Sequence, residues 1–201
     1  SDPVAGQTFT YSLVDSAGGR FKISGSELQV ADGSLLNYEA ATSHQVTVRA
    51  TDNGSPALSL DKIFTIMLTN VNEAPSNISL SASSIAENVA TGTAVGTLSA
   101  SDPDAGQTYT YALLDDANGR FKLAGAQLQV ADGTLLNYES AASHQVTVRV
   151  TDNGSPALSL DKIFTITITN VNETPSDIFL ELSSVSENAS DGVAVGDFSA
   201  N

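Results

Sequence analysis

The sequence predicts an all-β protein built of tandem seven-stranded β-sandwich modules. Residues 1–76 align with residues 101–176 without a gap, at an offset of 100 residues, and most positions are identical. Apolar and polar residues alternate over short runs, and turn residues separate these runs at the spacing typical of a β-sandwich. No run places apolar residues at the i, i+3, i+4 and i+7 positions of a helix. The repeat therefore defines a module of about 100 residues, which is a normal domain size.

A short segment marks the boundary between modules. The sequence Thr-Asn-Val-Asn-Glu occupies residues 69–73 and again residues 169–173, and Pro75 and Pro175 follow the two copies. Each copy comes directly after an alternating run, so a strand ends there and a new module begins. The predicted division is a partial module lacking its first two strands, a complete module, and the first strands of a third module, at residues 1–75, 76–175 and 176–201.

The first half of the complete module contains three predicted strands. Residues 77–82 alternate apolar and polar side chains, and a turn at residues 91–92 leads to a second strand at 94–100. The Asp- and Gly-rich residues 102–106 form a loop that ends this strand. Tyr and Leu side chains recur at every second position of residues 109–113, which places them on one face of a third strand.

The second half of the module supplies the other four strands. Residues 121–123 and 128–130 are two short strands separated by a Gly-containing turn. Valines alternate with Thr and Arg over residues 146–150, which indicates a half-buried strand. Residues 152–156 have turn chemistry, and residues 163–169 form the last strand with Phe and Ile side chains inward.

The net charge limits the class of partner. The chain carries 23 acidic and 8 basic residues, a formal net charge of −15. Nucleic acid is therefore not an expected partner, because phosphate binding requires clustered Lys and Arg. A divalent cation, or simple solubility, fits the acidic surface better.

Other functional classes lack the residues that they need. The absence of cysteine excludes disulfides and thiolate zinc sites. No apolar run approaches the roughly 20 residues of a membrane-spanning helix, so no membrane insertion is expected. His44 and His144 occupy equivalent positions of the two repeats, with no partner acid fixed beside them, so the chain is not expected to be an enzyme.

Five short motifs in a fixed order resemble a known family. They lie at residues 87–88, 102–104, 136–139, 148–152 and 170–175. This order resembles a cadherin domain and is similar to the tandem cadherin-like repeats of large bacterial surface adhesins. The resemblance implies an immunoglobulin-like (cadherin-type) Greek-key sandwich of seven strands, with Ca²⁺ bound at the joints between successive modules.

The resemblance also implies two sets of calcium ligands. The first joint would use Glu39, Asn70, Asn72, Glu73, Asp102, Asp104 and Asp152. The second would use Glu87, Glu139, Asn170, Asn172 and Glu173. The chemistry of the first set agrees, since calcium takes 6–8 hard oxygen ligands and the five carboxylates of this set all fall in predicted loops. Without a cation, these carboxylates would repel one another if the modules stack end to end.

An EF-hand is not expected at the Asp-Pro-Asp loop. Leu113 stands where that loop would need its twelfth-position Glu, and no helices flank it. The chain also departs from the animal cadherin pattern, with Asn at positions 37, 70, 137 and 170 and Glu at 73 and 173 in place of Asp. Each joint then has fewer aspartates, which leaves the number of ions open. The first repeat has Asp2 but Val4 where the second has two aspartates, so its upstream joint is expected to hold calcium less fully.

Three functions are weighed. The leading hypothesis is a calcium-stiffened rod or spacer of a long extracellular or cell-surface adhesin, whose partners are the neighbouring modules of the same chain. The alternative is a filament or fibre subunit, in which residues 176–201 of one copy complete residues 1–75 of another by strand addition. A polysaccharide- or protein-binding module ranks third, because the chain has 5 Tyr and no Trp.

Overall fold

The computed structural model describes residues 6–200, so Asp2 and Val4 lie outside the described residues. The backbone divides into two compact units. The first contains residues 6–77, 100–109 and 150–160, and the second contains residues 78–99, 110–149 and 161–200. The loops at 102–106 and 152–156 thus belong to the same unit as the segment at residues 69–73.

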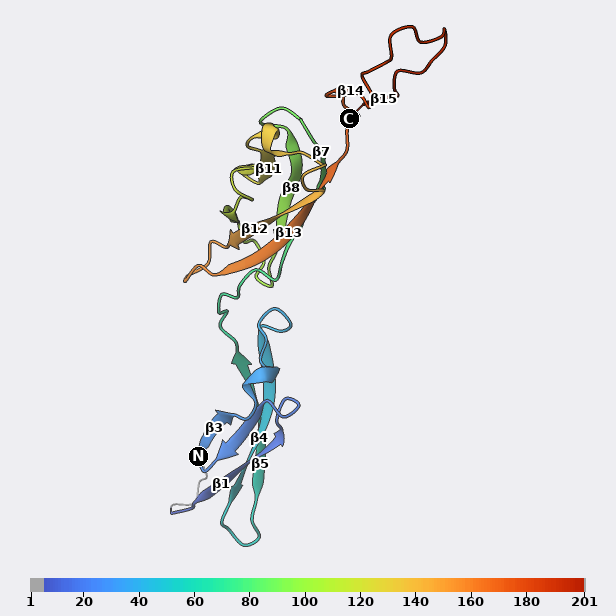
Figure 1. The fold of residues 1–201 in the computed structure, drawn as a ribbon. Helices are drawn as coiled ribbons and strands as arrows, with labels where there is room; N and C mark the ends of the chain where they lie inside the picture. Colours follow the sequence, from blue (N-terminus) through green and yellow to red (C-terminus); the bar gives the residue numbers. More distant parts are fainter. Residues whose placement is uncertain (1–5, 201) are drawn as a thin grey trace. The chain divides into compact units, whose positions relative to one another are not determined.

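The first unit contains a three-stranded antiparallel sheet and a separate hairpin (Figure 1). The sheet has the order β1-β4-β5, and β2 pairs with β3. Phe21 and Val46 are buried, whereas Val30 at the end of β3 is 50% exposed. The bounds are β1 Phe9–Asp15, β2 Phe21–Ser24, β3 Glu27–Val30, a 3-10 turn η1 Gly33–Leu35, β4 Ser43–Asp52 and β5 Ser59–Met67.

Residues 76–175 fold into two four-stranded sheets, of order β10-β11-β8-β6 and β7-β13-β12-β9. Figure 1 shows β12 and β13 side by side in the second of these sheets. The bounds are β6 Asn77–Leu80, β7 Ser84–Ala86, β8 Ala94–Ser101, β9 Thr110–Asp115, β10 Phe121–Ala124, β11 Gln127–Val130, a 3-10 turn η2 Gly133–Leu135, β12 Ser143–Thr151 and β13 Ser159–Thr169.

The core of the second unit joins the two sheets. Phe121, Leu128 and Val130 come from one sheet, and Val146 and Ile166 come from the other. All five belong to one buried cluster, so the sheets pack face to face as a β-sandwich. This confirms the all-β sandwich that the alternating sequence predicts.

The structure adds one strand to the seven predicted in residues 76–175. The chain leaves the first sheet after Leu80 and enters the other sheet as β7. There it pairs in parallel with β13, with Ile85 opposite Ile168. Three residues are too few to show alternation, so the sequence pattern misses this strand. The described residues contain no α-helix, and none of their helical turns is long and apolar enough to cross a membrane.

A two-stranded antiparallel ribbon follows residue 176. It consists of β14 (Ile178–Leu180) and β15 (Phe198–Ala200). These strands correspond to β6 and the end of β8 at the repeat offset of 100 residues. Phe198 is 78% exposed, whereas its counterpart Leu98 is 3% exposed.

Candidate metal centres

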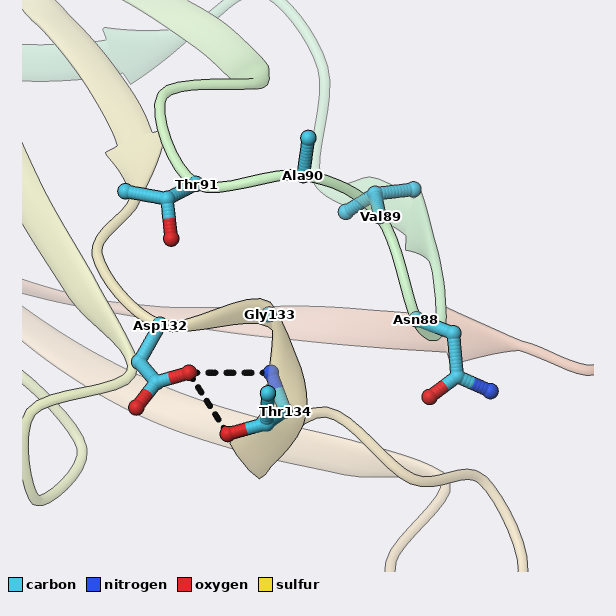
Figure 2. A pocket seen from close by; sticks show the side chains of 7 residues that line it. All are labelled: Asn88, Val89, Ala90, Thr91, Asp132, Gly133 and Thr134. Atoms are coloured by element: carbon cyan, nitrogen blue, oxygen red, sulfur yellow. Dashed lines mark hydrogen bonds between the residues drawn. The ribbon is translucent and has the colours of Figure 1, made fainter.

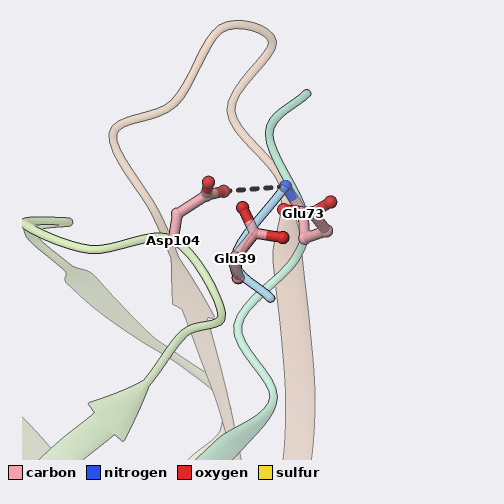
Figure 3. A group of neighbouring side chains, drawn as sticks. All are labelled: Glu39, Glu73 and Asp104. Carbon is pink, nitrogen blue, oxygen red and sulfur yellow. Dashed lines mark hydrogen bonds between the residues drawn. The ribbon is translucent and has the colours of Figure 1, made fainter. Parts of the chain in front are cut away.

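Three carboxylates meet in the first unit. Glu39, Glu73 and Asp104 each place an oxygen within 4.8 Å of the others (Figure 3). Glu39 lies in the turn before β4, Glu73 in the segment after β5, and Asp104 in the loop after β8. Asp104 is buried, Glu73 is half-buried and Glu39 is exposed. Three loops far apart in sequence thus supply one cluster.

Hydrogen bonds hold Asp104 in this cluster. The Asn70 amide donates to Asp104 Oδ1 over 2.6 Å, and the Glu73 N–H donates to Oδ2 over 2.9 Å. These two donors, the Asn70 amide first, hold the pKa of Asp104 below its ordinary value. The N–H of Asp104 in turn donates to Asp102 Oδ1 over 3.0 Å. Asp104 is therefore kept ionised and directed towards Glu73.

Two carboxylate oxygens in the same place lack a partner. Glu73 Oε2 and Asp102 Oδ2 are buried and accept no hydrogen bond from any described residue. Burial raises the pKa of Glu73, and the charges of Glu39 and Asp104 raise it further. Such orphaned buried oxygens are uncommon in folded proteins. Hard, anionic oxygens of this kind fit the ligand preference of Ca²⁺.

Asp152 lies in the same unit, but both of its carboxylate oxygens accept hydrogen bonds from other protein groups. Its Oδ1 accepts the N–H groups of Gly154 and Leu158, both at 2.9 Å, and its Oδ2 accepts the Asn72 amide at 3.1 Å. Burial acts to raise the pKa of Asp152, but these hydrogen bonds outweigh it and the pKa is lowered. Burial also raises the pKa of Tyr109, with the charges of Asp102 and Asp152 adding to the effect. Asp152 is not part of the three-carboxylate cluster.

A second cluster lies in the second unit. Glu87, Glu139 and Glu173 also place one oxygen each within 4.8 Å of one another. Glu87 is 1% exposed and accepts the N–H groups of Tyr138 and Val171, both at 2.8 Å. These two backbone donors, Tyr138 first, lower the pKa of Glu87. A fully buried and ionised carboxylate therefore anchors this cluster.

Asparagine amides direct the two exposed members. Asn170 donates to Glu139 over 3.0 Å, and Asn88 donates to Glu173 over 2.8 Å. The remaining predicted ligand, Asn172, is exposed in the segment after β13. The structure therefore brings Asn170 together with the three glutamates, and adds Asn88, which sequence reasoning missed. The sequence signal for Asn88 is its position next to Glu87.

Gln107 is a further residue that sequence reasoning missed. Its amide donates to Asn72 Oδ1 over 2.7 Å, and its Oε1 accepts the Asn153 N–H over 3.3 Å. Gln107 therefore connects the 69–73 segment to the loop at 152–156. Its place directly after the loop that carries Asp102 and Asp104 is the only sequence signal of this role.

A pocket of about 270 Å³ lies beside Asn88 in the second unit, lined by residues 88–91 and 132–134 (Figure 2). Asp132 Oδ1 accepts the N–H and the hydroxyl of Thr134 at 3.0 and 2.7 Å. A Cβ at Gly133 would overlap the carbonyl oxygen of Val89, so only glycine fits there. None of the described polar atoms that line the pocket is buried without a partner. The hydrogen bonds of the pocket are thus internal ones that fix the turn.

Comparison with known proteins agrees with this fold. Residues 81–169 match the cadherin domain family. Protocadherin gamma-A9 of Pan troglodytes is 29% identical over 171 residues, covering 79% of this chain and 18% of the relative. The Fat-like cadherin-related tumor suppressor homolog of Drosophila melanogaster is 30% identical over 146 residues, covering 69% of this chain and 3% of the relative. These matches support cadherin-like repeats in this chain.

Solved structures show the same fold. Mouse cadherin-23 EC22-24 matches with a TM-score of 0.64 at 23% identity, over 99% of this chain and 68% of that one. The cis-dimer structure of protocadherin gammaB7 EC3-6 matches with a TM-score of 0.59 at 23% identity, over 96% and 50% of the two chains. The cadherin-type β-sandwich is thereby confirmed. The chain spans less than a fifth of the length of the curated relatives quoted above.

Proposed function

We propose that this chain is a calcium-stiffened rod or spacer segment of a long extracellular adhesin, with Ca²⁺ bound at the joints between successive modules. The observation that carries the proposal is the pair of buried, unpartnered oxygens Glu73 Oε2 and Asp102 Oδ2. Glu73 belongs to the three-carboxylate cluster, and burial together with the charges of Glu39, Asp104 and Asp102 makes this arrangement unfavourable without a cation. The large bacterial surface adhesins that the motif order resembles are the proposed setting.

The ligands proposed at the first joint are Glu39, Glu73, Asp102 and Asp104. A bound cation would neutralise their charge and draw together the turn before β4, the 69–73 segment and the loop after β8. Asn70 directs an amide hydrogen at Asp104, which keeps that carboxylate ionised and positioned. The predicted roles of Asn70, Asn72 and Asp152 as ligands stay predictions, and Asn70 could use either its side-chain oxygen or its backbone carbonyl.

The second joint uses the cluster of Glu87, Glu139 and Glu173. Backbone donors hold Glu87 in place, and the Asn170 amide holds Glu139, so both carboxylates are positioned before a cation binds. Asn170 and Asn172 remain predicted ligands. Two of the three carboxylates of this cluster are exposed, whereas only Glu39 is exposed in the first. We therefore expect the second joint of this chain to bind calcium more weakly than the first.

The extracellular location rests on the relatives. One similar structure is described as protocadherin gamma B2 extracellular cadherin domains 3-6, with a TM-score of 0.60. Stiff spacers that hold a binding tip away from a surface require tandem modules with rigid joints, and the repeat supplies the modules. The proposed partners are therefore the neighbouring modules of the same chain, together with Ca²⁺.

Calcium titration of the chain tests this function. Isothermal titration after chelation is expected to show binding below millimolar concentration, and calcium is expected to raise the temperature of unfolding. The Glu73→Gln variant removes one charge from the first joint and is expected to lose the tighter binding step. Absence of binding below millimolar calcium, together with an unchanged temperature of unfolding, would contradict the proposal.

A second candidate function is assembly by strand addition between copies. Two segments expose apolar side chains whose repeat counterparts are buried: Val30 is 50% exposed and Val130 is 0%, and Phe198 is 78% exposed and Leu98 is 3%. In the second unit, β11 pairs with β8 as well as β10, whereas within residues 6–200 β3 pairs with β2 alone. Residues 176–200 of one copy would thus cover residues 6–75 of another.

Light scattering of this chain distinguishes the two functions. Strand addition predicts dimers or longer species that form as the concentration rises and do not require calcium. The Phe198→Asp variant should then be monomeric, and Phe179→Asp on the same ribbon serves as a matched surface change. A chain that stays monomeric at high concentration, with residues 6–75 protected from hydrogen exchange, would rule out this second function.

A further inference from the structure

The chain contains three Asn-Gly pairs, at residues 53–54, 118–119 and 153–154. Asparagine before glycine is prone to deamidation, because the backbone nitrogen of the glycine attacks the asparagine Cγ and no side chain of the glycine hinders it. The attack forms a succinimide ring and releases ammonia, and water then opens the ring to aspartate or isoaspartate. The rate at each pair therefore depends on how the fold holds its two residues.

Two properties are common to the three pairs. Each asparagine is exposed, so water reaches all of them. Each glycine N–H donates to an aspartate carboxylate over 2.8–2.9 Å, and the donor and acceptor residues are Gly54 and Asp52, Gly119 and Asp116, and Gly154 and Asp152. These bonds restrain the attacking nitrogen alike in all three pairs, so a difference in rate must come from elsewhere.

The side chain of Asn118 differs from the other two in lacking a hydrogen bond. Asn53 Oδ1 accepts the Thr8 N–H over 3.0 Å, and Asn153 Oδ1 accepts the Thr108 N–H over 2.8 Å. Within residues 6–200, no group hydrogen-bonds to the side chain of Asn118. The Cγ of Asn118 is therefore free to turn towards the nitrogen of Gly119, whereas Asn53 and Asn153 must first break a hydrogen bond.

The space around Gly119 is also open. A Cβ at Gly119 would meet no atom within 4 Å, whereas a Cβ at Gly154 would overlap the side chain of Asn72. A Cβ at Gly54 would lie 3.1 Å from Asp52 Oδ1. The backbone at residues 118–119 thus has room to move as the ring closes, whereas the backbone at the other two pairs is packed against its neighbours.

We propose that Asn118 is a site of spontaneous deamidation, and that the fold protects Asn53 and Asn153 from the same reaction. A bond forms between Gly119 N and Asn118 Cγ, the Cγ–NH₂ bond breaks, and the proton lost from Gly119 N balances the one that ammonia takes up. One water then hydrolyses the ring, so the reaction needs no other reagent. This inference does not rest on the proposed function.

The product would alter the turn between β9 and β10. The reaction adds a negative charge, and isoaspartate lengthens the main chain between Ala117 and Gly119 by a methylene group. The Ala117 carbonyl accepts Arg120 Nη1 over 2.8 Å, so the added length would disturb a hydrogen bond that fixes this turn. The first repeat has Gly18-Gly19 at the equivalent positions and has no asparagine there to react.

Peptide mass spectrometry of the intact chain, aged at mildly alkaline pH and then cut with trypsin, tests the proposal. Cleavage after Lys and Arg places the three pairs in separate peptides, residues 50–62, 63–120 and 150–162. Modification of Asn118 should be roughly five- to tenfold faster than that of Asn53 or Asn153, because one restraining hydrogen bond fewer has to break. Fragmentation of peptide 63–120 assigns the change to Asn118, and isoaspartate should accompany it.

Asn118→Gly is the matched variant, because Gly18 holds the equivalent position of the first repeat with a φ of 68°, close to the 57° of Asn118. It should fold as the wild type does and lose the modification of peptide 63–120 alone. In urea, where the fold restrains none of the pairs, all three should react at similar rates. Equal or faster modification of Asn53 or Asn153 in the folded chain would overturn the proposal, as would an unmodified Asn118 after the time in which the unfolded chain reacts fully.

Discussion

Residues 28–30 and 128–130 have the same sequence, Leu-Gln-Val, yet they occupy different environments. Leu128 and Val130 are 0% exposed, whereas Leu28 is 38% exposed and Val30 is 50% exposed. Both segments form a strand that pairs with the strand before it, with the same register. The local structure is therefore the same in the two repeats, and only the burial differs.

The difference follows additional strands that the structure describes in the second repeat only. In the second repeat β11 also pairs with β8, and β13 pairs with β7. Val95 on β8 joins the core cluster that contains Leu128 and Val130. Among the described residues of the first repeat, β3 and β5 have no such partners. Strand formation here is thus a property of the local sequence, while the core depends on segments distant in sequence.

Truncating the buried leucine tests this comparison with the largest expected effect. Leu128→Ala should lower the free energy of unfolding of the second repeat by about 2–5 kcal/mol, because it leaves a cavity in a closed core. Leu28→Ala should cost the first repeat about 1 kcal/mol or less, since its side chain already meets water. Urea unfolding followed through NMR signals of each repeat measures both values.

Equal losses at the two positions would contradict this explanation. They would mean that Leu28 is as well buried in solution as Leu128, and hence that another segment or another copy of the chain covers β3. Repeating the Leu28→Ala measurement over a range of protein concentrations distinguishes these cases, because only cover from another copy depends on concentration.

The fold was predictable because its signals are local. Val146, Val148 and Val150 alternate with polar residues, and all three are buried on β12 as predicted. β7 was not predictable, because its three residues gain their partner only when the chain crosses to β13. The exposure of Val30 was likewise not visible in its own sequence, which is identical around Val130.

The two acidic clusters extend the comparison to the proposed function. The first contains a buried aspartate and the orphaned buried oxygen of Glu73, whereas Glu139 and Glu173 of the second are exposed. Glu73→Gln should therefore weaken calcium binding by about tenfold or more, and Glu173→Gln should have a smaller effect. Isothermal titration of both variants measures the two affinities. A larger loss in Glu173→Gln would show that the second cluster is the tighter site.

The pH dependence of stability is expected to show a smaller effect than the change in calcium affinity. Burial and neighbouring charges raise the pKa of Glu73 above its ordinary value of 4.5 in the calcium-free protein. The folded state then holds this proton more tightly than the unfolded state does. The resulting stabilisation is present below pH 4.5 and is lost as the pH rises through the raised pKa.

Glu73→Gln should therefore melt a few degrees above the wild type at pH 7 in EDTA and close to it at pH 4. Adding calcium at pH 7 should reverse the order, because only the wild type gains the cation. Thermal melts at the two pH values, with and without calcium, measure this. If the variant melts below the wild type in EDTA at pH 7, the crowded carboxylates are not a cost in the calcium-free chain.

Motif order predicts which acidic residues belong to the first site, but it does not predict how the surrounding residues hold each of them. Asp102, Asp104 and Asp152 all lie in loops of one unit, as the turn residues predicted. That Asp152 is engaged by Asn72 and backbone N–H groups depends on the exact course of the 152–156 turn. Sequence spacing does not fix that course, and neither does it reveal that Gln107 reaches Asn72.

One ion pair is the same in both repeats, and its removal should change stability less than any of the substitutions above. Arg49 contacts Asp61 and Arg149 contacts Asp161, each through two hydrogen bonds of 2.7 Å, and the side chains are similarly exposed. Exposed pairs contribute little to stability. Arg49→Ala and Arg149→Ala should therefore both change the urea midpoint slightly and by the same amount.

The expected equality of the two changes in urea midpoint tests whether the two strand pairs are alike. β4 pairs with β5 in the first unit and β12 pairs with β13 in the second, so each ion pair depends only on its own strand pair and not on β6, β7 or β8. If Arg149→Ala lowered the urea midpoint much more than Arg49→Ala, the two strand pairs would differ in more than the strands that lie next to them. The burial of Leu128 could then not be attributed to the additional strands alone.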